Sequence, residues 1–232
     1  MVSRSNSTAR AGESNLIRIG GLAIIVGMMV HIVLNMVLKE FPPDNPTSSE
    51  LQEYLAREAG TWAIIHGFRY LAFMCIVLFA AALFARTCRT RPASEMGWGV
   101  VGLLGAAVFV TNGIVTNGIE MLAFLNTPPV NQSRDLFFAL FGLTRVLFTA
   151  EVVTWSMLIL GFSVAGWRSA TLPRWMSALG FVQVVAGMIA GVTISSALSE
   201  SGVAIPLEVA SAAGLLWFLC VGVYLLARGD AV

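Results

Sequence analysis

The sequence predicts an all-α fold, a polytopic bundle of six transmembrane helices with both termini in the cytoplasm. Hydrophobic residues make up 57% of the 232 residues and charged residues only 12%, whereas about a quarter of the residues of soluble proteins are charged. The apolar residues gather in six stretches, each long enough to cross a hydrocarbon core of about 30 Å. Positive charge is concentrated at one set of ends of these stretches.

The six apolar stretches define the predicted spans and a single transmembrane domain over residues 16–228. The spans cover residues 16–38, 60–86, 98–125, 136–167, 174–197 and 204–227. The polar residues 1–15 predict a disordered cytoplasmic tail, and residues 229–232 form a second short tail. The first span is longer than the apolar core of a signal peptide, so we expect it to remain as a membrane helix.

Basic residues that flank the spans indicate the orientation. Nine arginines lie at one set of span ends, Arg4, Arg10, Arg18, Arg86, Arg89, Arg91, Arg168, Arg174 and Arg228, against Lys39, Arg57 and Arg134 at the other. By the positive-inside rule, the arginine-rich ends and both termini face the cytoplasm. The sequence therefore predicts a multi-pass protein of the plasma (cytoplasmic) membrane.

The first outer loop is predicted to contain a short amphipathic helix at residues 47–59. Thr47 and Glu50 form a capping-box pattern at its start. Leu51 and Leu55 follow at helical spacing, so one face of this helix is apolar. We expect the helix to lie on the outer membrane interface, either as a lid over a cavity or as a cover of the bundle.

Small residues predict close packing between the helices. Gly187 and Gly191 form a GxxxG pattern in the fifth span, and Gly102 and Gly105 lie near the start of the third. Such glycine-rich faces suit the neighbouring helices of one bundle, and they equally suit a homo-oligomer. The partners we consider are thus the lipid bilayer and a second copy of the chain. The net charge of +1 argues against nucleic acid.

Six ionisable residues fall inside the predicted spans, namely His31, His66, Arg69, Glu120, Arg145 and Glu151. A charge at the centre of a membrane helix costs about 2.5–3.5 kcal/mol, so these residues are functional candidates that should face the interior. Glu120 has Arg69 and His66 as candidate partners, and Glu151 has Arg145 and His31. A buried ion-pair network that sets helix register is the structural alternative.

Other polar and aromatic residues accompany these groups. We assign substrate binding to Arg69, Arg145, Asn112, Asn117, Trp62, Tyr70, Trp155 and Glu208. Asn112 and Asn117 belong to the polar stripe that leads to Glu120. Glu208 follows Pro206 at the start of the last span, where stabilisation by the helix macrodipole explains it as well as substrate binding does.

Carboxylates and imidazoles in a dry, aromatic-rich bundle favour acid–base chemistry on a lipophilic substrate that enters from the bilayer. Catalytic roles fall to Glu120, Glu151, His66 and His31, with a carboxyl group giving a proton and an imidazole taking one. Protonation-initiated cyclisation or isomerisation is the reaction type that fits. No HExxH, GxSxG, glycine-rich phosphate loop or paired-cysteine motif occurs, and no cofactor is predicted.

Two other function classes stay open at the level of sequence. His31 and His66 lie at one predicted depth on adjacent spans and could ligate a haem or, with Glu120, a divalent metal. A proton-coupled transporter of small molecules or lipids would use the carboxylates as a relay.

Two segments resemble bacterial six-helix integral membrane proteins of unknown function. They are RIGGL at 18–22, which opens the first span, and residues 161–180, which contain Arg168-Ser169 and LPRW at 172–175. The resemblance spans most of the chain and implies the fold. In length, helical membrane character and intramembrane carboxylates, the chain is also loosely similar to integral membrane terpene cyclases, which protonate polyprenyl groups. That likeness of organisation implies an isoprenoid as one candidate substrate.

Overall fold

The protein is a bundle of long helices. The computed structural model describes residues 3–34, 46–88, 96–125, 133–193 and 205–228. Six helices and no strands occur in these ranges: α1 (Ser3–Ile32), α2 (Ser48–Cys88), α3 (Gly97–Phe124), α5 (Arg134–Ser169), α6 (Arg174–Val192) and α8 (Ile205–Arg228). All six are long and apolar enough to cross a membrane. The predicted all-α, six-span, multi-pass membrane bundle is confirmed.

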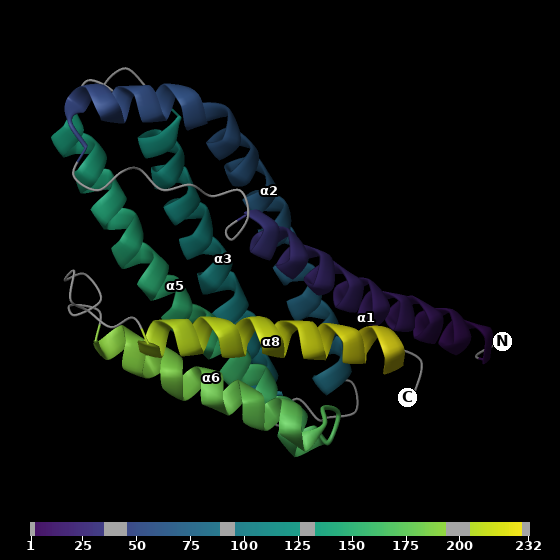
Figure 1. Ribbon diagram of the computed structural model, residues 1–232. Helices are drawn as coiled ribbons and strands as arrows, with labels where there is room; N and C mark the ends of the chain where they lie inside the picture. Colours follow the sequence, from purple (N-terminus) through teal and green to yellow (C-terminus); the bar gives the residue numbers. More distant parts are fainter. Residues whose placement is uncertain (1–2, 35–45, 89–95, 126–132, 194–204, 229–232) are drawn as a thin grey trace.

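The helices form two groups that cross one another (Figure 1). In the first group, α3 packs against both α2 and α5. In the second, α8 packs against both α1 and α6, and the groups are joined through α1 on α2 and α6 on α5. The start of α1 and the end of α8 are directed toward the same side of the molecule (Figure 1). That this side faces the cytoplasm stays a prediction.

Arginine side chains fasten the end of the bundle at which α2 and α8 finish, which we call the arginine-rich end. Arg86 is buried there and donates a hydrogen bond of 3.0 Å to the backbone oxygen of Arg228. Its guanidinium lies 5.2 Å from the ring centroid of Tyr224. The guanidinium of Arg174 lies 5.8 Å from the ring centroid of Trp167. These contacts join α2 to α8 and α5 to α6.

The capping box at the start of α2 is confirmed. The backbone N–H of Thr47 donates to Oε2 of Glu50 at 2.7 Å, and the backbone N–H of Glu50 donates to Oγ1 of Thr47 at 3.3 Å. The amphipathic segment 47–59 is not a separate helix, however, because it continues into the second span as one helix of 41 residues. No proline separates the two segments, so the ladder of backbone hydrogen bonds continues.

The first part of α2 lies across the ends of α3 and α5 before the helix turns along the bundle (Figure 1). Leu51 and Leu55 are buried on its inner face, as the amphipathic pattern predicts. The segment therefore covers the end of the bundle opposite the arginine-rich end. We call this the covered end.

Helix α1 extends further toward the N-terminus than predicted. The polar residues 1–15 are expected to be disordered, yet α1 begins at Ser3. The expectation is wrong from Ser3 onward, because adding turns to an existing helix costs much less than nucleating a new one. Several other predictions fall outside the described residues, namely Lys39, Arg89, Arg91, the span ends at 35–38, 194–197 and 204, and the tail at 229–232.

The predicted glycine faces are used inside the chain, against α5. A Cβ added to Gly105 of α3 would overlap the backbone of Leu158, and one added to Gly187 of α6 would overlap Oγ of Ser156. These positions need glycine because the helices approach closely there. A homo-oligomer stays a prediction.

Two of the three apolar clusters among the described residues are large, and the ionisable groups of α2 and α3 lie between these two. The larger core, near the arginine-rich end, includes Ile76 of α2 and Phe109 of α3. The smaller core, at the covered end, includes Ile65 of α2 and Ala123 of α3. The ionisable residues of α2 and α3 fall between these pairs in the sequence, so the fold places them in a layer between the cores.

Candidate functional site

His66 and Asn117 form a hydrogen-bonded link between α2 and α3. Nδ1 of His66 lies 2.7 Å from Oδ1 of Asn117, and Nδ2 of Asn117 donates to the backbone oxygen of His66 at 3.2 Å. Because the amide nitrogen is used in this way, Oδ1 is the acceptor and His66 donates from Nδ1. Both residues are buried. The link thus fixes the orientation of the imidazole ring.

Arg69 and Glu120 form an ionic link one helical turn away. Nη1 of Arg69 donates to Oε2 of Glu120, and the two side chains are 13% and 9% exposed. Each residue follows a member of the His66–Asn117 pair by three positions, so the two links share one face of each helix. Of the partners considered for Glu120, the described contacts select Arg69.

A cavity of about 540 Å³ adjoins the ion pair. Side chains from α1, α2, α3, α5 and α8 line it, and seven of the predicted site residues are among them: His31, Arg69, Asn117, Glu120, Arg145, Glu151 and Trp155. Its volume falls in the range of about 300–1,000 Å³ found for small-molecule sites. The predicted convergence of intramembrane polar groups on one place therefore holds for these seven residues.

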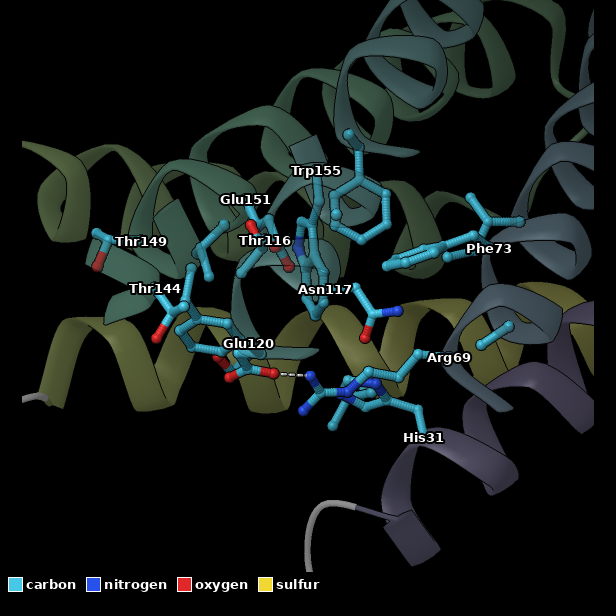
Figure 2. Close-up of a pocket in the computed structure, with 18 of the residues that line it drawn as sticks. His31, Arg69, Phe73, Thr116, Asn117, Glu120, Thr144, Thr149, Glu151 and Trp155 are labelled. Carbon is cyan, nitrogen blue, oxygen red and sulfur yellow. Dashed lines mark hydrogen bonds and ion pairs between the residues drawn. The ribbon is translucent and has the colours of Figure 1, made fainter. Parts of the chain in front are cut away.

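The cavity has an ionic side and an aromatic side. Figure 2 shows Glu120 and Arg69 pointing toward each other, with His31 beyond Arg69, while Phe73 and Trp155 lie across the cavity from them. One face of α3 runs from the aromatic side of the cavity to its ionic side. Phe109 and Glu120 both line the cavity and lie three turns apart on this face. The cavity therefore suits an amphipathic or lipophilic molecule with one polar end.

Glycines allow the aromatic rings to lie against neighbouring helices. A Cβ on Gly113 of α3 would lie 2.5 Å from Cε1 of Phe73, so the ring occupies the space of the missing side chain. In the same way, the indole ring of Trp155 lies against Gly214 of α8. These two contacts hold the aromatic side of the cavity in place.

Threonine hydroxyl groups add acceptors to the cavity wall. Thr116, Thr144 and Thr149 line the cavity, and each donates its hydroxyl proton to a backbone oxygen of its own helix. A hydroxyl oxygen whose proton is used in this way still accepts hydrogen bonds. The three groups thus favour a ligand that carries a donor.

A carboxyl group and a guanidinium group from α5 complete the cavity. Glu151 is half-buried and lines it together with Arg145. Arg145 is exposed, and its guanidinium lies 5.0 Å from the ring centroid of Phe141. A residue that both lines the cavity and is exposed lies at the rim, so Arg145 is placed to meet a polar group near the entrance.

Two residues of the predicted site belong to the wall behind the cavity. His66 and Trp62 do not line it. The indole of Trp62 stacks on Phe124 with ring centroids 3.8 Å apart, lies 5.6 Å from the His66 ring and donates from Nε1 to Oη of Tyr54 at 3.0 Å. The catalytic role of His66 and the binding role of Trp62 stay predictions, and neither residue is among those that line this cavity. Both residues join the cavity wall to the smaller core.

Three further predicted residues are not among those that line the cavity. Asn112 donates from Nδ2 to the backbone oxygen of Leu147 at 3.1 Å and joins α3 to α5. Tyr70 is exposed and donates to Sδ of Met121 at 3.7 Å. Glu208 is exposed in the first turn of α8, where the macrodipole explains it. These placements could not be predicted, because the spacing of residues along a helix does not determine how the helix is rotated in the bundle.

Sequence reasoning missed most of the aromatic wall and the contribution of α8. From α8, the cavity is lined by Leu207, Ser211, Leu215 and Phe218. Their spacing of four, four and three residues is a signal for a single helix face. The pattern was present in the sequence, but nothing in it distinguishes a cavity face from a face packed in the core.

The described residues do not form the alternative metal site. No group of three or more His, Cys, Asp or Glu side chains within the described ranges could hold a metal ion. His31 lines the cavity whereas His66 does not. The set of His31, His66 and Glu120 is therefore not among such groups.

No protein-family model matches the chain, nor does any curated protein or solved structure. The chemistry of the cavity therefore rests on its own residues. They offer two carboxyl groups, one imidazole and two guanidiniums beside aromatic rings. This set can bind a polar group, exchange protons with it and exclude water around it.

Proposed function

We propose that the protein is a membrane-embedded enzyme that uses acid–base chemistry on a lipophilic substrate bound in the cavity. One observation carries the proposal. Seven residues from four different helices, chosen because they are costly or polar inside a membrane, meet at one cavity whose far side is aromatic. Ionisable residues that face a shared intramembrane space mark functional sites.

The contacts divide the roles of the two carboxyl groups. Glu120 is the ion-pair partner of Arg69, and an ionised carboxylate only accepts hydrogen bonds. We therefore assign the pair to the orientation of the polar end of the substrate. We assign proton donation to Glu151 and proton acceptance to His31, since both line the cavity.

The proposed reaction needs no oxidant or reductant. Glu151 gives its carboxyl proton to one carbon of an alkene, or to the oxygen of an epoxide or carbonyl group. The positive charge that forms is stabilised by the faces of Trp155 and Phe73. His31 then takes a proton from a neighbouring carbon, and the electrons of the broken C–H bond form the new double bond. The result is an isomer or a cyclised product, and an isoprenoid is a substrate class that suits these steps.

Deuterium transfer to carbon tests the proposal. The purified protein in lipid nanodiscs is incubated in deuterated water with a mixture of polyprenyl alcohols and a total lipid extract, and products are analysed by mass spectrometry. We expect wild-type protein to place deuterium on carbon, and Glu151→Gln to do so at least about 100-fold more slowly, the contribution typical of a general acid.

Glu208→Gln is the matched control, because Glu208 is a carboxyl group that is exposed and does not line the cavity. It should react as wild type does. Equal deuterium transfer by wild type and Glu151→Gln would remove Glu151 from the mechanism. Equal loss in Glu151→Gln and Glu208→Gln would show that the cavity is not where the proton is transferred.

A further inference from the structure

The interface of α5, α6 and α8 contains a second set of polar side chains, outside the cavity. Ser156, Ser163, Ser177, Gln183 and Trp217 are all buried there, and we call them the polar seam. Gln183 donates from Nε2 to Oγ of Ser156 at 3.0 Å. Four other atoms of the seam have no hydrogen-bond partner among the described residues: Oγ of Ser163, Oγ of Ser177, Oε1 of Gln183 and Nε1 of Trp217.

The members of the seam follow one another along α6. Ser177, Gly180 and Gln183 are spaced by three residues, so each lies about 4.5 Å along the helix from the next. At Gly180, Oγ of Ser163 from α5 and Nε1 of Trp217 from α8 both lie within 2.9 Å of the position that a Cβ would take. At this level, polar atoms of α5 and α8 therefore meet beside α6, and at Gln183 a polar atom of α5 meets α6.

One member of the seam, Ser156, directly follows a residue of the cavity wall in the chain. Trp155 lines the cavity and precedes Ser156 in the chain. Its Nε1 is buried, lies 2.7 Å from the Cβ position of Gly214 and has no hydrogen-bond partner in the part of the chain that the structure describes. The other end of the seam is Ser177, one turn inside the arginine-rich end. The seam thus crosses the half of the bundle that the cavity does not reach.

Polar atoms in a membrane interior need hydrogen-bond partners, and inside proteins ordered water supplies them where side chains do not. A water molecule that bridges two polar atoms spans two hydrogen bonds of about 2.8 Å each, which matches the rise of one helical turn. We propose that internal water molecules occupy the polar seam and complete a hydrogen-bonded path, from the cavity to the arginine-rich end, along which protons move.

The path gives the cavity a supply of protons that does not pass through the lipid. Serine hydroxyls, the Gln183 amide and water all donate and accept hydrogen bonds, as proton transfer along a chain requires. Under the proposed function, the path returns to Glu151 the proton that it gives to the substrate and carries away the proton that His31 takes. Only this use of the path rests on the proposed function, while the presence of water in the seam does not.

Exchange of the Trp217 indole proton tests the proposal without a substrate. The protein, labelled with ¹⁵N at its six tryptophans, is placed in nanodiscs, and the Nε1–H signals are assigned with single Trp→Phe variants. We expect the Trp217 signal to show a cross-peak to water and to exchange with deuterated water at least tenfold faster than Trp62. Trp62 is the internal reference, because it is equally buried but donates to Oη of Tyr54.

Two variants test the path between the cavity and Trp217. Gln183→Leu replaces a polar member of the seam with an apolar side chain of similar size, and it should slow exchange at Trp217 at least tenfold. Ser169→Ala is the control, because its hydroxyl is already bonded to the backbone oxygen of Ala165, outside the seam. A wild-type Trp217 signal that lacks the water cross-peak and exchanges as slowly as Trp62 would overturn the proposal. If the wild-type protein shows fast exchange at Trp217 but no turnover of any lipophilic substrate, only the proposed function is contradicted.

Discussion

The ion pair between Arg69 and Glu120 should contribute strongly to the stability of the bundle, because both charges are largely removed from solvent. Their side chains are 13% and 9% exposed, and they join α2 to α3. Arg69→Met leaves the Glu120 carboxylate buried without this counter-charge, which costs about 3–5 kcal/mol when a buried pair loses one partner. In a domain of this size each kcal/mol lowers the Tm by about 2–4 °C, so we expect a decrease of about 6–20 °C.

A surface ion pair of the same chain is the matched control. Arg57 and Glu58 lie 2.7 Å apart, but the Arg57 side chain is 62% exposed. Such pairs contribute about 0–1 kcal/mol, so Arg57→Met should lower the Tm by no more than about 4 °C. Both variants are compared with wild type by thermal unfolding in one detergent, followed by tryptophan fluorescence.

The double variant Arg69→Met with Glu120→Leu separates the ion pair from simple loss of side chains. It removes both charges and leaves apolar groups of similar size, so it should be more stable than Arg69→Met alone. A Tm for Arg69→Met as close to wild type as that of Arg57→Met would refute the reasoning. A decrease in Tm of the double variant equal to the sum of the decreases of Arg69→Met and Glu120→Leu would refute it as well, because the two charges would then act independently.

Three further predictions concern the cavity and the start of α2. Thr116→Phe should fill the cavity and abolish the capture of lipophilic molecules, measured by native mass spectrometry, whereas Thr111→Phe on the exposed face of α3 should not. Gly113→Ala should weaken capture by moving the Phe73 ring, with the Tm within about 4 °C of wild type because alanine favours the helix by about 1 kcal/mol. Thr47→Ala removes the cap of α2, costs about 0.5–2 kcal/mol and should lower the Tm by about 1–8 °C.

Each of these predictions has an outcome that contradicts it. Equal capture by Thr116→Phe and Thr111→Phe would show that ligands bind elsewhere. Unchanged capture by Gly113→Ala would mean that the Phe73 ring does not limit the cavity. For the cap, Ser48→Ala is the control, since Ser48 is exposed next to Thr47, and equal melting of the two variants would argue against the capping box.

Features that depend on local sequence or on the membrane could be predicted. The capping box at Thr47 needs only residues three positions apart, and it formed as expected. The six spans follow from length and apolar content, because every backbone polar group in lipid must be bonded within its own helix. The meeting of Glu120, Arg69 and Glu151 at one cavity follows from the cost of placing a charge against lipid.

Features that depend on the rotation of one helix against another could not be predicted from the sequence. Asn112 and Asn117 lie five positions apart on α3, which separates them by well over a quarter of a turn. One bonds to a backbone oxygen of α5, and the other holds His66 beside the cavity. Which of the two would face the cavity depends on how α3 packs between α2 and α5, and composition and spacing carry no information on that packing.

The sequence by itself determined that this chain is a six-helix membrane protein and that inward positions are favoured for ionisable residues within its spans, since both follow from the energetic cost of polar groups in lipid. Only the tertiary structure decided that Glu120 pairs with Arg69, that His66 is enclosed behind the cavity wall and that a polar seam runs beside α6. The physical reason is that these outcomes depend on contacts between helices distant in sequence. Such contacts are set by the packing of the whole bundle rather than by any one segment.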